Sequence, residues 1–278
     1  MSRIFDVAGK VAVITGAGNG IGRAVARSLA ARGCNVALAD VSEDGMEETT
    51  RLIGGRVNVT RHQLDVSDAA AVAAFPEQVI AAHGGVDILV NNAGVGVGGT
   101  FEQISEADFD WLMNINLFGV VRMSRAFLPE LKKGPRAQLV NVSSILGIVA
   151  PPNATAYSMS KFGIRGFSES LRHELEAVRS SVGVTVVHPG GIRTSIVDNA
   201  RFSADISAEA TEAQRKWQSQ TLLMDPERAG EIIVSAIEKR KARILVGSDA
   251  KLFSIVERIM PVSHWSVIHR LMKLMSKL

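Results

Sequence analysis

The sequence predicts an α/β protein built on one doubly wound, parallel, seven-stranded sheet with helices on both faces. Between residues 10 and 246, short apolar runs rich in β-branched residues alternate with longer segments of helical periodicity, as in consecutive βαβ units. The first run, Val11-Ala12-Val13-Ile14, is apolar throughout, which is typical of strands buried on both faces. We expect strands at residues 11–14, 35–39, 57–64, 86–90, 138–142, 183–188 and 243–246.

Helical periodicity fills the intervals between these strands. Apolar residues recur at helical spacing over residues 24–31, 44–53, 67–82, 105–131, 155–178 and 226–239. In the fourth segment Trp111, Ile115 and Phe118 fall on one side of the helix. No linker, repeat or low-complexity tract divides the chain, so we expect one domain over residues 1–246. A polar insertion at 194–224 interrupts it, and an extension at 247–278 follows it.

Composition narrows the class of protein. The chain has 278 residues, of which 46% are hydrophobic and 21% charged, as in globular proteins and unlike disordered ones. A single cysteine, Cys34, excludes an internal disulfide. Arg3 and Asp6 lie where a signal peptide needs an apolar stretch, and no run of about 18 apolar residues is present. We therefore expect a cytoplasmic protein.

The basic character of the chain is concentrated at its end. The formal net charge is +3 and the isoelectric point about 9.2. Residues 258–278 contain Arg258, Arg270, Lys273 and Lys277 and no acidic residue, so the preceding 257 residues carry −1. A nearly neutral body argues against a nucleic-acid partner.

A glycine-rich turn follows the first strand. Gly16, Gly20 and Gly22 occur in Thr15-Gly-Ala-Gly-Asn-Gly-Ile-Gly22, which leads directly into a helix. Such glycines let the backbone turn tightly and approach a pyrophosphate, which a helix N-terminus favours electrostatically. The spacing is G-x3-G-x-G and differs from the general G-x-G-x-x-G fingerprint. A tight strand-to-helix turn without a ligand is the alternative interpretation.

The predicted second strand ends in an acidic residue, Asp40. A carboxylate eighteen residues past Gly22 can accept both ribose hydroxyls of an adenosine and repel a 2′-phosphate. Asn19 in the turn and Val41 after the aspartate supply no cation for such a phosphate. These residues favour NAD over NADP, although a solvated turn aspartate is the alternative.

Tyr157 and Lys161 are four residues apart at the start of a predicted helix, so they share a face. A free tyrosine has a pKa near ~10 and needs a nearby cation to serve as a base at neutral pH. Lys161 is spaced to supply that cation. Tyr157 is the only tyrosine in the chain, and Ser144 lies thirteen residues earlier at the end of a predicted strand.

These residues complete a set of motifs that resembles the short-chain dehydrogenase/reductase family, in its single-domain branch of about 250 residues with a Rossmann-type sheet. The motifs occur in the family's order and span residues 11–246. They are the glycine turn, Asp65-Val66, Asn91-Asn92-Ala93-Gly94, Asn116, Ser144, the pair Tyr157 and Lys161, and Pro189-Gly190-Gly191-Ile192-Arg193-Thr194.

The resemblance implies a role for each matching residue. Tyr157 is the implied general acid/base, Lys161 lowers its pKa, Ser144 binds the substrate oxygen, and Asn116 places a water in a proton relay. The implied cofactor-binding residues are Gly16, Asn19, Gly20, Ile21, Gly22, Asp40, Asp65, Val66, Asn91, Ala93, Gly94, Tyr157, Lys161, Pro189, Gly190, Ile192 and Thr194. Outside the family, Asp65 and Thr194 have an ordinary interpretation as helix caps, and Asn91-Asn92 as a turn.

The expected function is an NAD-dependent oxidoreductase that transfers a hydride between nicotinamide and an apolar secondary alcohol or ketone. The alternatives are an NADPH-dependent ketoreductase, including one for 3-oxoacyl groups, and a non-catalytic dinucleotide-binding scaffold. The apolar substrate rests on uncharged side chains in three loops, which can equally be packing. They are Val95, Val97, Ile145, Leu146, Ile148, Val149, Pro151, Pro152, Ile196, Val197, Phe202, Trp217, Leu222 and Leu223.

Partners are expected from the family and from the extension. The resemblance implies a homodimer or homotetramer through the helices at 105–131 and 155–178, with Phe162, Phe167 and Leu171 as candidates for the seam. The histidines lack metal-ligand spacing, so no metal is expected. His188 lies next to the implied nicotinamide site. The basic, amphipathic extension either contacts an anionic membrane or packs on the substrate site or a neighbouring subunit.

Overall fold

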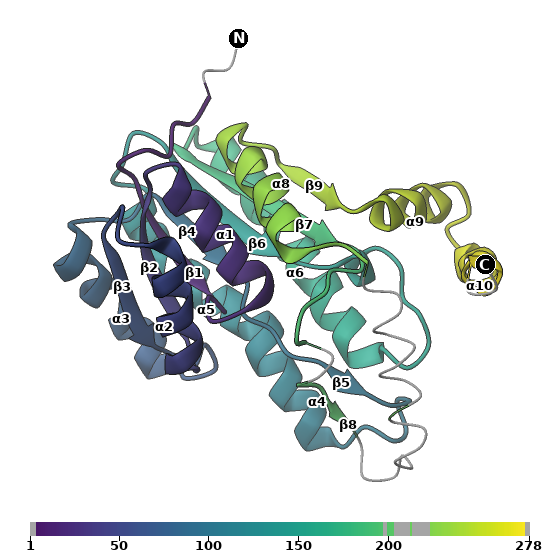
Figure 1. Cartoon of the computed structure of the whole chain (residues 1–278). Coiled ribbons are helices and arrows are strands. Elements are labelled where there is room, and N and C mark those ends of the chain that lie inside the picture. Colours follow the sequence, from purple (N-terminus) through teal and green to yellow (C-terminus); the bar gives the residue numbers. More distant parts are fainter. Residues whose placement is uncertain (1–3, 197–198, 203–211, 213–222, 276–278) are drawn as a thin grey trace.

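The computed structural model describes residues 4–196, 199–202, 212 and 223–275, and in residues 271–275 only the backbone. Its centre is a parallel seven-stranded sheet with the order β3-β2-β1-β4-β6-β7-β9 (Figure 1). The strands are β1 Val11–Thr15, β2 Asn35–Asp40, β3 Val59–Gln63, β4 Ile88–Asn91, β6 Ala137–Val142, β7 Val182–Pro189 and β9 Arg243–Val246. The predicted doubly wound sheet is confirmed, and β3 begins two residues later than expected.

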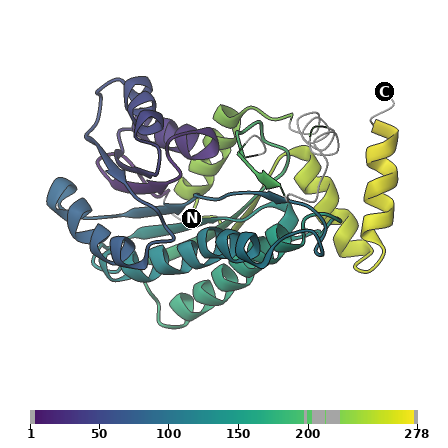
Figure 2. The same ribbon diagram turned by 90° about the horizontal axis from the view of Figure 1, so that it is seen from below.

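Helices cover both faces of the sheet, as Figure 2 shows. One layer holds α1 Gly20–Ala31, α2 Glu43–Ile53 and α8 Pro226–Glu238, and the other holds α3 Ala69–His83, α5 Gly119–Leu131 and α6 Thr155–Ala177. Alternation along β1 explains the two cores. Ala12 and Ile14 pack under the first layer, whereas Val11 and Val13 pack under the second.

Asp68 begins α3. Its carboxylate accepts the N–H groups of Ala70 and Ala71 at 2.9 and 3.0 Å, which satisfies donors of the first turn. Asp65 instead accepts the N–H of Ser67 at 2.8 Å in the preceding turn. The alternative interpretation of Asp65 as the cap of this helix is therefore wrong.

The single helix predicted over residues 105–131 is interrupted. The segment divides into α4 Glu106–Met113, a π-helical turn Asn114–Phe118, and α5. A π turn inserts an extra residue into the helical ladder and is frequent at functional sites. Here it contains the buried Asn116, whose side chain bonds to a neighbouring loop.

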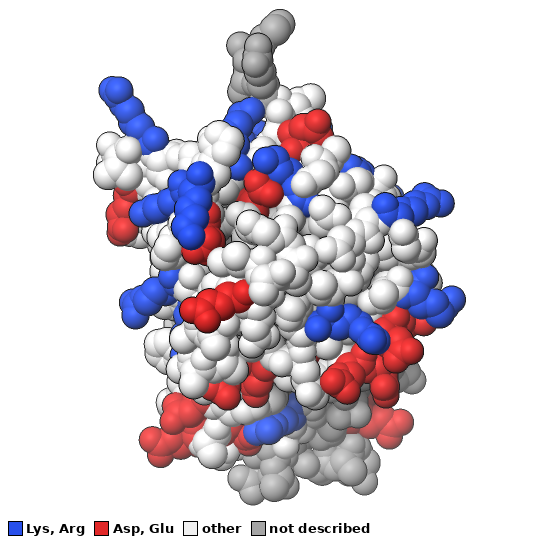
Figure 3. All heavy atoms as spheres, turned by 90° about the vertical axis from the view of Figure 1, so that its left-hand side faces the viewer, with Lys and Arg blue, Asp and Glu red and all other residues white. Residues whose placement is uncertain are grey.

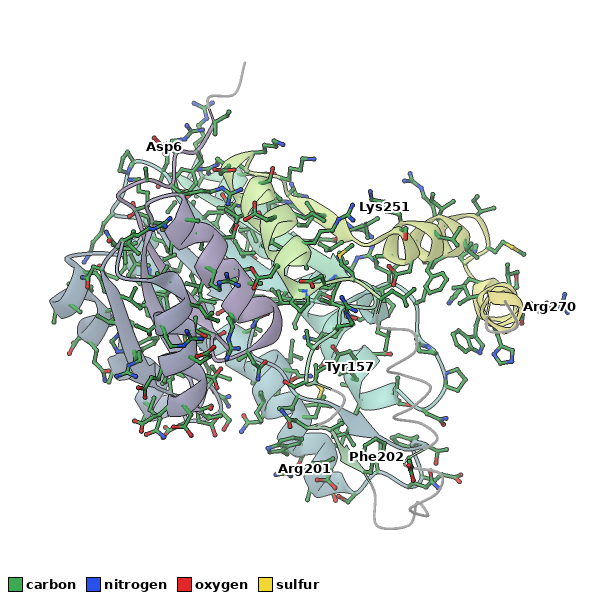
Figure 4. All side chains as sticks on the ribbon, viewed as in Figure 1. Asp6, Tyr157, Arg201, Phe202, Lys251 and Arg270 are labelled. Atoms are coloured by element: carbon green, nitrogen blue, oxygen red, sulfur yellow. The ribbon has the colours of Figure 1, made fainter. Side chains whose placement is uncertain are left out.

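A two-stranded ribbon, absent from the sequence prediction, is formed by β5 Val97–Gly98 and β8 Arg201–Phe202. The guanidinium of Arg201 lies 3.6 Å from the centroid of the Trp111 ring and 3.1 Å from a carboxylate oxygen of Asp108 (Figure 4). These contacts join the start of the 194–224 insertion to α4. Val197, Trp217 and Leu222, expected to cover a substrate, lie outside the described residues.

The extension forms α9 Ser248–Ile259 and α10 His264–Met275. Their inner sides pack on the segment after β6, in a cluster that joins Ala250, Trp265 and Ile268 to Ile145 and Ile148. The packed interpretation therefore accounts for one side of the extension. Figure 4 shows Lys251 and Arg270 pointing away from the body. Within the described ranges, none of the helices combines the length and apolar character that a membrane crossing requires.

The surface of the body carries both signs of charge. On the side where β3 and α3 lie, Figure 3 shows basic and acidic side chains interspersed. This distribution agrees with the nearly neutral charge of residues 1–257.

Candidate active site

The functional motifs follow strands that end at one edge of the sheet. β1 ends at Thr15, β4 at Asn91, β6 at Val142 and β7 at Pro189. The strands are parallel, so these ends lie side by side. The chain order reverses between β1 and β4, which is where ligands bind in open α/β sheets.

The glycine turn after β1 has the shape of an anion cradle. Gly16 and Gly20 have φ values of +64° and +51°, which side-chain-bearing residues rarely adopt. A Cβ at Gly22 would overlap the carbonyl oxygen of Gly16. α1 starts at Gly20, and Asn19 makes no side-chain cap hydrogen bond. Donors at the start of α1, including Ile21, thus lack a side-chain cap, so the turn fits a dinucleotide pyrophosphate.

Asp40 lies against this turn. Its carboxylate accepts the N–H of Gly18 at 2.8 Å and that of Ser42 at 3.0 Å. A Cβ at Gly18 would lie 2.9 Å from the carboxylate, so the glycine allows the close approach. Val41 is exposed beside it. The carboxylate is therefore fixed where an adenosine ribose would follow the pyrophosphate.

Arg23 is a cation at the same turn that the sequence reasoning missed. Its guanidinium donates to the carbonyl oxygens of Gly18 and Gly45, and its Nε donates to the hydroxyl of Thr49 at 3.0 Å. The spacing from the glycines is the signal that could have found it, since residue 23 lies one turn into α1.

The loop after β4 locks two strand ends together. The Nδ2 atom of Asn92 donates to the carbonyl oxygens of Thr15 and Gly16 at 3.0 and 3.2 Å. Asn91 is buried, and its Nδ2 atom donates to Ser124 and Asn141 at 3.0 and 2.8 Å. Its side chain therefore points into the interior, and the expected contact with a ribose would fall to its backbone.

Two further expected cofactor contacts lie at the adjoining strand ends. Ala93 lies against Gly16, where a Cβ would be 2.9 Å from its Cα atom. Val66 is buried against Gly119 at the start of α5. Ala93 therefore lies against the glycine turn, whereas Val66 lies against the start of α5.

Asn116 links the π turn to the loop after β4. Its Oδ1 atom accepts the N–H of Val95 at 2.8 Å, and its Nδ2 atom donates to the Val95 carbonyl at 3.0 Å. A Cβ at Gly94 would lie 3.3 Å from Asn116 Oδ1 and 3.6 Å from Lys161 Nζ. The glycine, the amide and the ammonium group therefore converge at one point.

Ser144, Tyr157 and Lys161 are brought together by β6 and α6. Ser144 follows β6 and accepts the N–H of Leu146 at 3.1 Å. Lys161 Nζ donates to the Val142 carbonyl at 3.2 Å and lies 5.4 Å from the centroid of the Tyr157 ring. Tyr157 is half-buried and packs against an apolar cluster that contains Val97, Leu112 and Met113.

Burial sets the protonation of this pair. It raises the pKa of Tyr157 to about 12, and a side-chain hydrogen bond with Ser144 opposes the rise. It also lowers the pKa of Lys161 to about 8. Each charged form is unfavourable alone in this environment, so a phenolate requires the ammonium group beside it.

The loop after β7 lies between β9 and the glycine turn. Gly190 donates its N–H to the Val246 carbonyl at 2.8 Å, and Ile192 pairs with Met224. Thr194 reaches the glycine turn, where a Cβ at Gly20 would lie 3.0 Å from its methyl carbon. Gly20 and Thr194, which are 174 positions apart in the chain, therefore border the same cradle.

His188 lies next to the catalytic candidates, and its contact with them was not foreseen. Its Nδ1 atom is 2.9 Å from the carbonyl oxygen of Ser144. Burial lowers the pKa of His188 to about 4, so the ring is neutral at pH 7 and donates through Nδ1. No group of three His, Cys, Asp or Glu side chains suitable for a metal occurs in the described part of the chain.

The match to known proteins decides the family. The model of the family described as short chain dehydrogenase matches residues 10–204. The chain belongs to the short-chain dehydrogenase family. As a short-chain dehydrogenase it is an NAD(P)-dependent dehydrogenase or reductase.

Relatives extend the likeness over nearly the whole chain. The SadH protein of Mycobacterium tuberculosis is 40% identical over 263 residues, 94% of each chain. A 3-ketodihydrosphingosine reductase of Bacteroides thetaiotaomicron is 33% identical, covering 80% of this chain and 78% of its own. A short-chain dehydrogenase of Burkholderia phymatum, solved in complex with NAD, has a TM-score of 0.84 and 30% identity over 92% of this chain and 95% of its own.

Proposed function

We propose that this short-chain dehydrogenase uses NAD to interconvert an apolar secondary alcohol and its ketone. The observation that carries the proposal is the convergence of the buried Ser144 and Lys161 with the half-buried Tyr157, near the loop that packs on the glycine cradle. The nicotinamide supplies the hydride chemistry when it is bound. The glycine turn, Asp40, Asp65 and the loops after β4 and β7 would hold the cofactor.

The side chains supply orientation and proton handling. The Ser144 hydroxyl holds the substrate oxygen and stabilises the charge that develops on it. Tyr157 takes the hydroxyl proton during oxidation and returns it during reduction. Lys161 stabilises the phenolate through its positive charge. Asn116, bonded to the Val95 backbone near Lys161, positions the route by which the proton leaves.

The preference for NAD rests on Asp40. Its carboxylate is held beside the turn by the N–H groups of Gly18 and Ser42, where it would repel a 2′-phosphate. The Burkholderia relative solved with NAD is consistent with this choice. Arg23 at the same turn supports the second candidate, an NADPH-dependent ketoreductase. Its guanidinium is occupied by backbone carbonyls and Thr49, which leaves NAD favoured.

An apolar substrate is supported by the surroundings of Tyr157. Val95, Val97 and Leu112 belong to the apolar cluster that contacts it. Ile145, Ile148 and Val149, which the sequence also suggested for the substrate, are buried against α9 and α10. They therefore act as packing. The relative named for 3-ketodihydrosphingosine agrees with a largely apolar ketone.

The test is an absorbance assay of nicotinamide reduction with NAD and NADP over a panel of secondary alcohols. Apolar alcohols should be oxidised faster than small charged hydroxy acids, and Tyr157→Phe should remove the activity. Preferential turnover of charged hydroxy acids would contradict the substrate class. Activity that survives Tyr157→Phe would contradict the mechanism, and turnover of none of the alcohols or matching ketones would favour a non-catalytic scaffold.

We also propose a homodimer or homotetramer that forms through α4, α5 and α6. Met159 and Phe162 on α6, and Phe118 in the π turn between α4 and α5, are exposed, which supports a covered face. Phe167 is half-buried and Leu171 packs partly on the core, so they contribute less. Sedimentation velocity of the wild type and of Phe162→Glu tests this: a monomeric variant supports the seam, and unchanged assembly contradicts it.

The outer face of α9 supports a further proposal, peripheral contact with an anionic membrane. Leu252, Ile255 and Ile259 are exposed there, beside the cations Lys251 and Arg258. An apolar face flanked by positive charge suits an anionic lipid surface.

A further inference from the structure

The first turn of α9 contacts the loop after β7 through Asp249. Its Oδ2 atom accepts the N–H of Gly191 at 2.6 Å, although 58 residues separate the two in the chain. Figure 1 shows why they meet: β7 and β9 lie side by side, and α9 follows β9 at the same edge of the sheet. Asp249 therefore contacts the backbone of the loop that follows β7.

The space around this carboxylate is made by two glycines. A Cβ at Gly190 would overlap both carboxylate oxygens, and a Cβ at Gly247 would overlap Oδ1. Gly247 also has a φ of +116°, which side-chain-bearing residues rarely adopt. Asp249 is the acidic residue of the first turn of α9, where a negative charge is favourable. The Asp249 carboxylate can therefore occupy this position because residues 190 and 247 have no side chain.

Backbone hydrogen bonds also hold this loop: the Gly191 carbonyl accepts the N–H groups of Leu223 and Met224 at 3.1 and 3.0 Å, and Arg193 donates to the Met224 carbonyl at 2.9 Å. Asp249 adds a side-chain acceptor for the Gly191 N–H. Gly190 bonds to Val246 at one end, and Thr194 lies against Gly20 at the other, next to the pyrophosphate cradle. The segment contains Gly190 and Gly191, and glycine has the largest backbone freedom of any residue type. A hydrogen bond to an ionised carboxylate is stronger than one to a neutral acceptor, so it suits the ordering of this segment.

We propose that Asp249 is a positioning residue that orders the Gly190–Gly191 backbone for the nicotinamide half of the dinucleotide. The inference rests on the proposed function, because it takes NAD as the ligand of this cleft. Ile192 and Thr194, the expected partners of the nicotinamide, directly follow the segment that Asp249 holds. The adenosine half is held elsewhere, at Asp40 and the glycine turn.

This division gives a specific test, in which dissociation constants for NADH and for ADP-ribose are measured by titration calorimetry. ADP-ribose has the adenosine and pyrophosphate but no nicotinamide. Asp249→Ala should weaken NADH binding about tenfold, because an N–H loses a charged acceptor, and leave ADP-ribose binding within about twofold of wild type. Asp249→Asn keeps an acceptor oxygen and should restore most of the affinity for NADH.

Glu257→Ala is the matched control, since it removes a carboxylate from the same helix more than two turns beyond Asp249. It should bind both ligands as the wild type does. Equal weakening of NADH and ADP-ribose in Asp249→Ala, or unchanged NADH binding, would overturn the inference. If Asp249→Ala does not fold, Asp249→Ser, which also removes the charged acceptor, replaces it and must show the same NADH-specific loss. A wild type that binds neither ligand overturns the proposed function and this inference with it.

Discussion

His188 Nδ1 donates a hydrogen bond to the backbone carbonyl of Ser144 across a distance of 2.9 Å. The imidazole is fully buried on β7, and its Nε2 atom has no hydrogen-bond partner among the described residues. Protonation would place a positive charge and an unpaired N–H in the interior. The contact that fixes the serine loop therefore depends on a neutral histidine.

Stability should fall in acid because of this residue. The pKa of His188 is about 4 in the fold and about 6.5 when unfolded. The folded pKa is the lower one, so its contribution is fully present above pH 6.5 and is lost as the pH falls toward 4. The loss is about 3 kcal/mol for a shift of this size. Urea unfolding at several pH values should show a shallower pH dependence for His188→Asn, and an unchanged one for the exposed control His269→Asn.

The rate of alcohol oxidation should increase with pH, because Tyr157 must lose its proton to accept one from the substrate. Lys161→Met keeps the length of the side chain and removes the charge that stabilises the phenolate. The rising part of the kcat/KM profile should therefore move to higher pH. Tyr157→Phe should lower kcat below the detection limit of the assay, a loss of at least about 10³-fold, while NADH binding persists. A Lys161→Met profile identical to that of wild type would contradict the assigned role.

Cofactor preference should depend on the charge of Asp40. Asp40→Ala with Val41→Arg replaces repulsion of a 2′-phosphate by attraction, and we expect the ratio of kcat/KM for NADP over NAD to rise roughly 100-fold. Asp40→Asn is the control, since its amide oxygen can still accept the N–H of Gly18. It should raise the ratio by less. Unchanged ratios in the double variant would remove Asp40 from this role.

The β5–β8 ribbon should affect substrate binding more than chemistry. Arg201→Ala removes the stacking on Trp111 and the ion pair with Asp108, which hold the ribbon on α4. We expect KM for an apolar alcohol to rise severalfold with kcat nearly unchanged. The free energy of unfolding should change by no more than about 1 kcal/mol, because the arginine is half-exposed. Arg201→Lys keeps the charge, so its KM should lie between those of the wild type and Arg201→Ala.

Membrane contact through α9 should require its exposed apolar face. The wild type should sediment with vesicles that contain anionic phosphatidylglycerol, and Ile255→Glu with Ile259→Glu should abolish that sedimentation. Vesicles of phosphatidylcholine alone should bind neither the wild type nor the double variant. Ile4→Glu is the matched control, because Ile4 is similarly exposed but lies near the N-terminus and not on α9. Equal sedimentation of all three proteins would contradict the membrane role, and a changed oligomeric state would assign the face to a subunit contact.

Much of the active site could be predicted because its signals are local. Tyr157 and Lys161 share a helix face by their spacing, and Gly16 and Gly20 occur where the backbone needs positive φ. The break at Asn116 could not be predicted, because apolar residues continue at helical spacing through the π turn. The position of Arg23 one turn into α1 could be read from its spacing, but its partners, the carbonyls of Gly18 and Gly45 and the Thr49 hydroxyl, could not.

The sequence by itself determined the seven strands, their helices and the motifs at the strand ends, since each depends on periodicity or on a few adjacent residues. Only the tertiary structure decided which distant residues meet. Asp249 reaches Gly191, His188 reaches Ser144, and the extension packs on Ile145. Such contacts arise when parallel strands align their ends at one edge, so they depend on the order of strands in the sheet. The extension that the sequence shows as basic is, in the fold, packed on the segment that follows Ser144.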